Sequence, residues 1–230
     1  MKKILLAAAS AAALMAGPAL AEEEAAGPWS ISGTVSLTSN YVFRGFTQTL
    51  EDPAIQAGVT LAHESGFYAG FWGSNVDFGD GESDLETDFY VGYGGSLGEN
   101  TTYDLNITYY AYPGTPGDFD YDYVEFIAGI THDFDVATVG VKGAYTPEFF
   151  GHIGDAFWLG GNLTVPLGDY FSVSGNIGEQ WFDEDGFDDY FHYDVGVTAT
   201  YESVSLDLRY VGTDVHDLDE YFVATLGFGF

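Results

Sequence analysis

Apolar and polar side chains alternate along most of this chain, and the alternation is clearest in its last segment, 221–230. Side chains on a β-strand point alternately to opposite faces, so a period of two predicts a strand with two different faces. Here one face is bulky and apolar, and the other is small. The bulky face carries Phe222, Ala224, Leu226, Phe228 and Phe230.

The same pattern recurs along the chain and predicts an all-β fold of twelve strands. Each segment has about 10 to 13 residues, the length that a tilted strand needs to cross a bilayer. Beyond the N-terminal segment, no stretch approaches the ~18 apolar residues of a membrane-spanning helix. The predicted strands are 29–39, 53–63, 66–77, 85–96, 101–112, 121–132, 136–145, 155–166, 170–181, 189–201, 204–213 and 219–230.

The connections between these segments alternate between tight and long. The tight ones are 64–65, 97–100, 133–135, 167–169 and 202–203, and the longer ones include 41–52, 113–120, 146–154 and 182–188. Such alternation is typical of the periplasmic turns and extracellular loops of an outer-membrane barrel. It predicts a single antiparallel transmembrane β-barrel with both termini in the periplasm. A soluble periplasmic β-sandwich stays open as an alternative, although nothing in a sandwich forces its connections to alternate.

The polar face of the segments favours lipid outside and water inside. In segment 204–213, for example, Leu206 and Leu208 lie on one face, whereas Asp207 and Arg209 lie on the other. The polar faces are rich in Ser, Thr, Gly, Asn and Asp and lack the Lys and Glu of a solvated surface. Aromatic residues near strand ends are interpreted as a membrane girdle. They are Trp29, Tyr103, Tyr112, Phe171, Trp181, Tyr201 and Tyr210.

The N-terminal segment has the pattern of a secretory signal peptide. Lys2 and Lys3 precede an apolar run, and Ala19 and Ala21 supply a small-x-small cleavage pattern. We therefore expect a signal peptide over 1–21, a flexible acidic leader over 22–28 and a β-barrel over 29–230. An exported chain of this kind spans a membrane only as a closed barrel, which predicts the outer membrane of a Gram-negative bacterium.

The composition is strongly acidic, with 36 Asp and Glu against five Lys and Arg. Such a charge repels nucleic acid and anionic ligands. It does not indicate disorder, because aromatic residues make up 17% of the chain. There is no cysteine, so thiol chemistry is excluded.

Two stretches carry a family resemblance. They are Ser39–Thr49 (SNYVFRGFTQT), followed by Pro53-Ala54-Ile55-Gln56, and His63–Phe78 (HESGFYAGFWGSNVDF). Together they resemble the TorF-type porin family, bacterial proteins of unknown function. The resemblance implies an outer-membrane barrel with a pore and without an established substrate. The terminal Phe228 and Phe230 resemble the closing strand of outer-membrane barrels, which implies an assembly signal read by the barrel-assembly machinery.

After removal of the signal peptide, three basic residues remain, and each has two interpretations. Arg44 either forks onto a carboxylate or anionic ligand at the pore mouth, or neutralises the carboxylates of the surrounding loop; we favour the second. Lys142 and Arg209 lie on polar faces, where a lone charge is costly, so we expect each to pair with a luminal acid. The pairs form either a cross-lumen ion-pair network or a selectivity filter, and both interpretations stay open. The predicted lumen residues are Arg44, Asp88, Asp104, Glu125, Lys142, Asp194, Asp207 and Arg209.

No residue pattern predicts a cofactor, a metal site or an enzyme. The acidic clusters 118–122, 183–189 and 214–220 lack the spacing of a calcium hand, and the five histidines lack metal-ligand spacing. We interpret the clusters as solvated loops that gather divalent cations at the lipopolysaccharide surface. A Ser-His pair suited to an outer-membrane lipid hydrolase is weakly indicated, so that function is the least favoured.

The sequence as a whole predicts a porin-like channel for passive diffusion of small solutes. The lumen of a twelve-stranded barrel is narrow, and Tyr90, Tyr110 and Trp158 would narrow it further if they point inward. With so few basic residues, we expect a preference for cations or neutral solutes. The alternative is a structural or adhesive barrel with a plugged lumen and functional loops.

Overall fold

The computed structural model describes residues 27–116, 121–184, 186–216 and 218–230. The predicted signal peptide 1–21 lies outside the described residues, as do most of the leader 22–28 and parts of all three acidic clusters, 118–120, Asp185 and Asp217.

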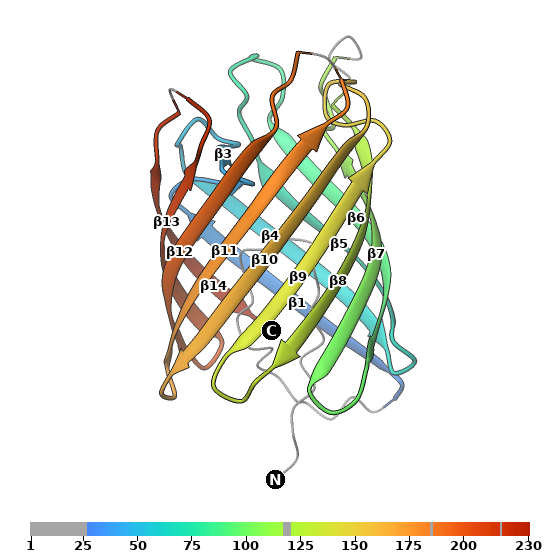
Figure 1. The fold of residues 1–230 in the computed structure, drawn as a ribbon, viewed down its shortest axis with the longest axis vertical. Helices are drawn as coiled ribbons and strands as arrows, with labels where there is room; N and C mark the ends of the chain where they lie inside the picture. Colours follow the sequence, from blue (N-terminus) through green and yellow to red (C-terminus); the bar gives the residue numbers. More distant parts are fainter. Residues whose placement is uncertain (1–26, 117–120, 185, 217) are drawn as a thin grey trace.

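The described chain forms a closed barrel of twelve antiparallel strands, as predicted (Figure 1). Each strand pairs with its neighbours in sequence, and β1 closes the barrel by pairing with both β4 and β14. The wall strands are β1 (Trp29–Thr38), β4 (Ala54–His63), β5 (Phe67–Asn75), β6 (Leu85–Ser96), β7 (Thr101–Ala111), β8 (Tyr123–Asp133), β9 (Thr138–Thr146), β10 (Ala156–Leu167), β11 (Phe171–Phe182), β12 (Tyr190–Tyr201), β13 (Val204–Thr213) and β14 (Tyr221–Gly229).

One element was not predicted. Within the long connection 39–53, β2 (Val42–Phe43) and β3 (Phe46–Thr47) pair as a small hairpin that belongs to no wall strand. Among the described residues, no helix is long and apolar enough to cross a membrane.

The two ends of the barrel differ in their connections, as the sequence predicted. We call them the long-connection end, at the top of Figure 1, and the tight-turn end, at the bottom. The long connections are 39–53, 76–84, 112–122, 147–155, 183–189 and 214–220, and the tight ones are 64–66, 97–100, 134–137, 168–170 and 202–203.

The wall is apolar outside and polar inside. On β13, Leu206 and Leu208 are 44% and 42% exposed, whereas Asp207 and Arg209 are 5% and 6% exposed. The inward side chains therefore include buried acids and amides, the reverse of a soluble domain, in which polar groups face out. The prediction that Tyr112 belongs to the membrane girdle is wrong. Its side chain is buried inside the barrel because the chain beyond β7 turns inward and packs on other aromatic rings.

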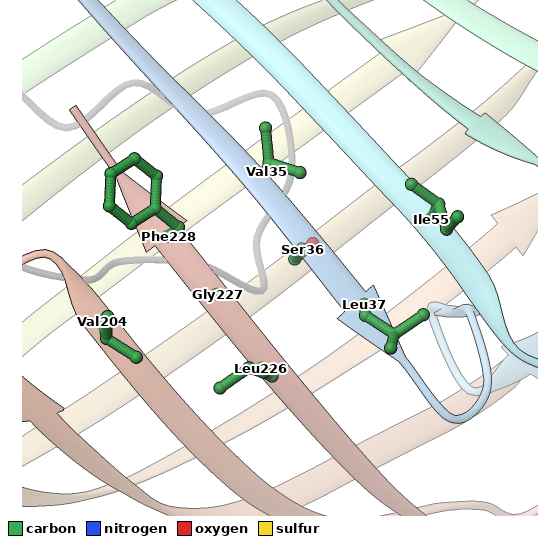
Figure 2. A pocket seen from close by; sticks show the side chains of 8 residues that line it. All are labelled: Val35, Ser36, Leu37, Ile55, Val204, Leu226, Gly227 and Phe228. Carbon is green, nitrogen blue, oxygen red and sulfur yellow. The ribbon is translucent and has the colours of Figure 1, made fainter.

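The barrel closes at the seam between β1 and β14. Beyond the strand ladder, Gly33 and Phe230 exchange two backbone hydrogen bonds, with N–O distances of 2.8 and 3.0 Å. The ring of Phe230 lies over Gly33, in space that any larger residue there would need. A shallow depression of about 370 Å³ follows the outer face of this seam (Figure 2). Its lining is mostly apolar and consists of Val35, Ser36, Leu37, Ile55, Val204, Leu226, Gly227 and Phe228.

Candidate functional site

The hairpin β2–β3 lies inside the lumen near the long-connection end. Its turn is Arg44-Gly45, and both residues have positive φ angles, +47° and +90°. This is the geometry of a two-residue type I′ turn, in which glycine is favoured at the second position. Arginine is unusual at the first position because its Cβ disfavours the left-handed region. Contacts elsewhere must therefore hold Arg44 there.

Those contacts come from the opposite wall. Arg44 donates from both terminal nitrogens to the two carboxylate oxygens of Glu125 on β8, at 2.9 and 3.0 Å. Nη1 also donates to Gln180 Oε1 on β11 at 3.0 Å. The side chains of Arg44 and Glu125 are 8% and 2% exposed, so the pair is nearly dry. Two parallel bonds from a guanidinium to a carboxylate fix both position and orientation.

Aromatic rings complete the environment of Arg44. Its guanidinium carbon lies 4.7 Å from the ring centre of Phe43 and 4.7 Å from that of Trp158. Trp158 Nε1 donates to His192 Nε2 at 2.8 Å, so this histidine nitrogen carries no proton. A Cβ on Gly45 would lie 3.0 Å from the Cβ of His192, which leaves little room for a larger residue.

The interpretation of Arg44 that we favoured from the sequence is wrong. Arg44 does not neutralise carboxylates of its own loop; its fork binds an acid of the barrel wall, Glu125, 81 residues away. The polar residues around Arg44 in the stretch 39–53 stabilise the loop by hydrogen bonds to one another. Thr47 Oγ1 donates to Asn40 Oδ1 at 2.7 Å, and Thr49 Oγ1 donates to the Asp52 carbonyl at 2.6 Å.

An aromatic cluster fills the same half of the lumen, which we call the upper lumen. Tyr110 and Tyr123 stack with ring centres 4.4 Å apart, and Tyr41 meets Trp72 edge to face. Tyr90 and Tyr110 point inward, as does Trp158 beside Arg44, so all three narrow the lumen. The buried members of this cluster are Tyr41, Ala54, Trp72, Val76, Tyr90, Tyr110, Tyr112 and Tyr123.

Two acids of β6 are buried beside the cluster. Glu86 is 2% exposed and Asp88 is 4% exposed. Tyr41 donates its hydroxyl to Glu86 Oε1 at 3.2 Å. Burial raises the pKa of Tyr41 well above its ordinary value, and Glu86 and Asp88 raise it further, so this hydroxyl keeps its proton. We did not predict Glu86, although its spacing of two from Asp88 puts both on the inward face of one strand.

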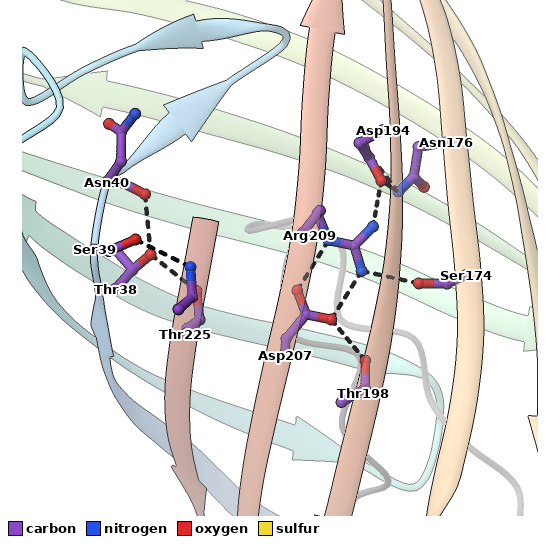
Figure 3. Close-up of polar contacts among 11 residues, drawn as sticks. Thr38, Ser39, Asn40, Ser174, Asn176, Asp194, Thr198, Asp207, Arg209 and Thr225 are labelled. Carbon is purple, nitrogen blue, oxygen red and sulfur yellow. Dashed lines mark hydrogen bonds and ion pairs between the residues drawn. The ribbon is translucent and has the colours of Figure 1, made fainter. Parts of the chain in front are cut away.

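A second polar cluster surrounds Arg209 nearer the middle of the wall (Figure 3). Arg209 forms an ion pair with Asp194 on β12, and its Nε donates to Asp207 Oδ1 at 3.0 Å. Its Nη2 also donates to Ser174 Oγ at 2.9 Å, and Asn176 donates to Asp194 at 2.8 Å. Arg209 therefore binds wall acids, as the cost of an unpaired luminal charge predicted.

The predicted lumen residues thus fall into separate groups. Arg44 and Glu125 form one group, and Asp194, Asp207 and Arg209 form another. Lys142 on β9 lies in the field of Asp104, which accepts a hydrogen bond of 2.6 Å from the Tyr68 hydroxyl. Phe228 and Phe230 lie apart from all of these, at the seam on the outer face. Among the described residues, no three His, Asp or Glu side chains gather as metal ligands would.

Solved structures resemble this barrel in fold. The KdgM porin matches with a TM-score of 0.59 at 8% identity, over 87% of this chain and 97% of that one. The NanC porin matches with a TM-score of 0.56 at 9% identity, over 87% and 98%. At these identities the likeness concerns the fold. No curated protein matches the sequence. Residues 22–225 match the family described as "Bacterial protein of unknown function (Gcw_chp)", and the chain belongs to that family.

Proposed function

We propose that this protein is an outer-membrane channel for small cations or small neutral solutes. The observation that carries the proposal is a closed barrel whose wall is apolar outside and polar inside. An apolar exterior of this kind suits hydrocarbon, and a polar interior suits water and solutes. The barrels of two porins share the fold, which supports the same assignment.

The preference against anions follows from how the basic residues are used. Arg44 is bound to Glu125, and Arg209 is bound to Asp194 and Asp207, so neither offers a free positive charge to a solute. One solved neighbour is described as the KdgM porin in complex with disordered oligogalacturonate, an acidic sugar. Among the described residues of the barrel, only Lys142 adds to these two basic side chains, and it is partly buried, so little basic surface is offered to such a ligand.

The second candidate is a structural or adhesive barrel with a plugged lumen. The observation that favours it is the hairpin, which contacts the wall in several directions. Arg44 reaches β8 and β11, whereas Val42 packs with Val211 and Val223 of β13 and β14. A segment that is held on opposite sides of the lumen reduces the open cross-section of the lumen, whether or not a solute passes through it.

A lipid hydrolase is less favoured. His63 Nδ1 and Ser65 Oγ lie 2.7 Å apart, but Ser65 also donates its backbone N–H to the same nitrogen. This arrangement is a local turn contact two residues apart, and no described acid orients the histidine as a catalytic base requires.

The remaining sequence predictions belong to the same proposal. They are cleavage after Ala21, location in the outer membrane of a Gram-negative bacterium, assembly by the barrel-assembly machinery, acidic loops beside lipopolysaccharide and the TorF-type assignment. N-terminal sequencing of protein from isolated outer membranes tests the first two together. We expect Glu22 as the first residue; retention of Met1 or recovery in the periplasm contradicts them.

Recording in planar bilayers tests the channel. We compare the wild type with a variant in which 41–48 is replaced by glycine and serine of equal length. A salt gradient should give a reversal potential that favours cations, and the variant should conduct more than the wild type. The preference should weaken at about 1 M salt, where the screening length falls to ~3 Å. If neither protein conducts, the structural barrel is the better assignment; an anion preference contradicts our charge argument.

A further inference from the structure

Two carboxyl groups of β6 are buried together without enough hydrogen-bond donors. Glu86 and Asp88 lie two positions apart on β6, so both point inward from one strand, and both are almost fully buried. Nevertheless, Glu86 Oε2 and Asp88 Oδ1 have no hydrogen-bond partner among the described residues. Two ionised carboxylates cannot satisfy each other because both only accept.

The surroundings supply no compensating charge. The hydroxyl of Tyr41 donates to Glu86 Oε1, the other oxygen of that carboxylate. Arg44, the basic residue of the upper lumen, is bound to Glu125 and Gln180. Glu125 adds a further negative field at Asp88. Two carboxylates that share a dry site do not both ionise, because their repulsion is not screened by water.

We propose that Glu86 and Asp88 hold one proton between them at neutral pH, and that this acid pair keeps the hairpin seated in the lumen. The protonated carboxyl donates to its neighbour, which gives the two unpartnered oxygens a shared bond. The pair then carries one negative charge instead of two, and Tyr41 binds that pair from the hairpin loop. The effect of the seated hairpin on conduction rests on the proposed function, because it requires that the barrel is a channel. The shared proton itself does not depend on that function.

A metal ion fits this site poorly. Calcium takes six to eight oxygen ligands, and magnesium requires a near-octahedral set. The described residues bring two carboxyl groups and one phenol here, with no third acid or histidine gathered as a ligand. A proton satisfies the same oxygens without further ligands.

Raising the pH should unseat the hairpin. The titratable or charged groups that share this environment are Tyr41 on the loop, Tyr90 on β6, Tyr110 and Tyr112 on and after β7, Glu125 on β8 and Arg44. Tyr110 donates to Glu125, so its proton is committed to that acid. Loss of the shared proton therefore places a second negative charge beside Tyr41, and no new hydrogen-bond donor stabilises that charge.

Infrared spectroscopy of the folded full-length barrel tests the shared proton directly. At neutral pH the wild type should show the carbonyl stretch of a buried protonated carboxylic acid. The band should be lost in Glu86→Gln and in Asp88→Asn, and kept in Glu82→Gln, a control that changes an exposed acid of the adjacent loop. A wild-type spectrum without the band overturns the proposal, as does a band that survives both pair variants.

Hydrogen exchange of loop 39–53 tests the link to the hairpin without any need for conduction. After correction for the intrinsic rate, exchange in the wild type should quicken severalfold as the pH rises and the band is lost. Glu86→Gln should stay slow, because its amide donates permanently to Asp88; Asp88→Asn provides the same test if Glu86→Gln does not fold. Exchange that ignores pH in the wild type overturns the link. Protection that depends on added CaCl₂ shows a metal ion as occupant instead. If both of these results are obtained but the protein does not conduct in planar bilayers, only the proposed channel function is refuted.

Discussion

The two halves of the lumen are built from different side chains although one wall surrounds both. The upper lumen contains the inserted hairpin and a cluster of buried rings, and its acids are almost dry. The lower lumen, toward the tight turns, contains Lys142, Asp104 and, near the middle of the wall, the Arg209 cluster. Asp207 and Arg209 are buried as well, whereas the Asp194 side chain is 12% exposed, compared with 2% for Glu125.

The difference teaches how a narrow barrel handles charge. In the upper lumen, a loop supplies the basic residue from outside the wall and brings apolar side chains with it. In the lower lumen, the wall supplies both partners: Arg209 and Asp207 come from β13, and Asp194 comes from the neighbouring β12. We therefore expect the constriction in the upper lumen and a more hydrated passage below it.

The largest expected effect concerns the seam, without which neither half exists. Replacing Phe228 and Phe230 with Asp should prevent assembly, mainly because the terminal aromatic signal is lost. The charge itself costs less at this end of β14 than the ~2–4 kcal/mol of a basic residue near the midplane. Heat-modifiable migration on gels reports the folded barrel. Phe222→Asp, on the same outward face of β14, is the control. Normal assembly of the double variant would refute the assembly signal.

The next effect should come from Arg44→Ala. It leaves Glu125 buried without its partner, which costs about 3–5 kcal/mol of unfolding free energy, and it frees the hairpin. We expect a lower unfolding midpoint and a larger single-channel conductance. Adding Glu125→Gln should recover part of the stability but not the closed lumen, since the fork is absent in both. Unchanged conductance in Arg44→Ala would place the constriction elsewhere.

A smaller effect is expected from Arg209→Ala in the lower lumen. The loss of its charged hydrogen bonds should cost roughly 1.5–3 kcal/mol, because water reaches part of this cluster. Conductance should change little, whereas the preference for cations should rise as Asp194 and Asp207 lose their partner. Arg209→Lys keeps the charge and serves as the control in reversal-potential measurements. If Arg209→Ala increases the single-channel current as much as Arg44→Ala does, the constriction is not confined to the upper lumen and the proposed difference between the two halves is wrong.

The smallest effect should come from Gly92→Ala on β6. The ring of Tyr68 lies against Gly92, in the space of an added Cβ, so the substitution forces the ring to move. Such overpacking costs about 1–3 kcal/mol. Gly129→Ala on β8 is a matched control, because its Cβ would meet nothing closer than 3.6 Å. Equal melting temperatures for the two variants would show that Tyr68 moves freely.

The wall could be predicted from the sequence because its signals are local. Alternation fixes which residues face lipid, and the lengths of the connections fix which end they occupy. On β13, the predicted apolar and polar faces are confirmed residue by residue. The outward face tolerates few polar residues, so the pattern stays clear along each strand.

The interior could not be predicted in the same way. The strands of the hairpin have two residues each, too short for a period to show, and its position depends on acceptors far along the chain. Tyr112 has the position of a girdle residue in the sequence, but the end of its strand meets the ring cluster rather than lipid. Arg44 likewise has acids near it in sequence, yet binds Glu125, which no local pattern indicates.

The bonds of Arg44 also set an order for assembly. Arg44 is 81 residues before Glu125 and 136 before Gln180, and Val42 packs on the last two strands. Contacts between residues so far apart in the chain form late, because long loops must close first. The hairpin comes early in the sequence, but its contacts with β8, β11, β13 and β14 form only when the wall is nearly complete. A barrel stalled before β14 arrives would therefore leave an unobstructed, leaky opening, and closing it would be the last step of folding.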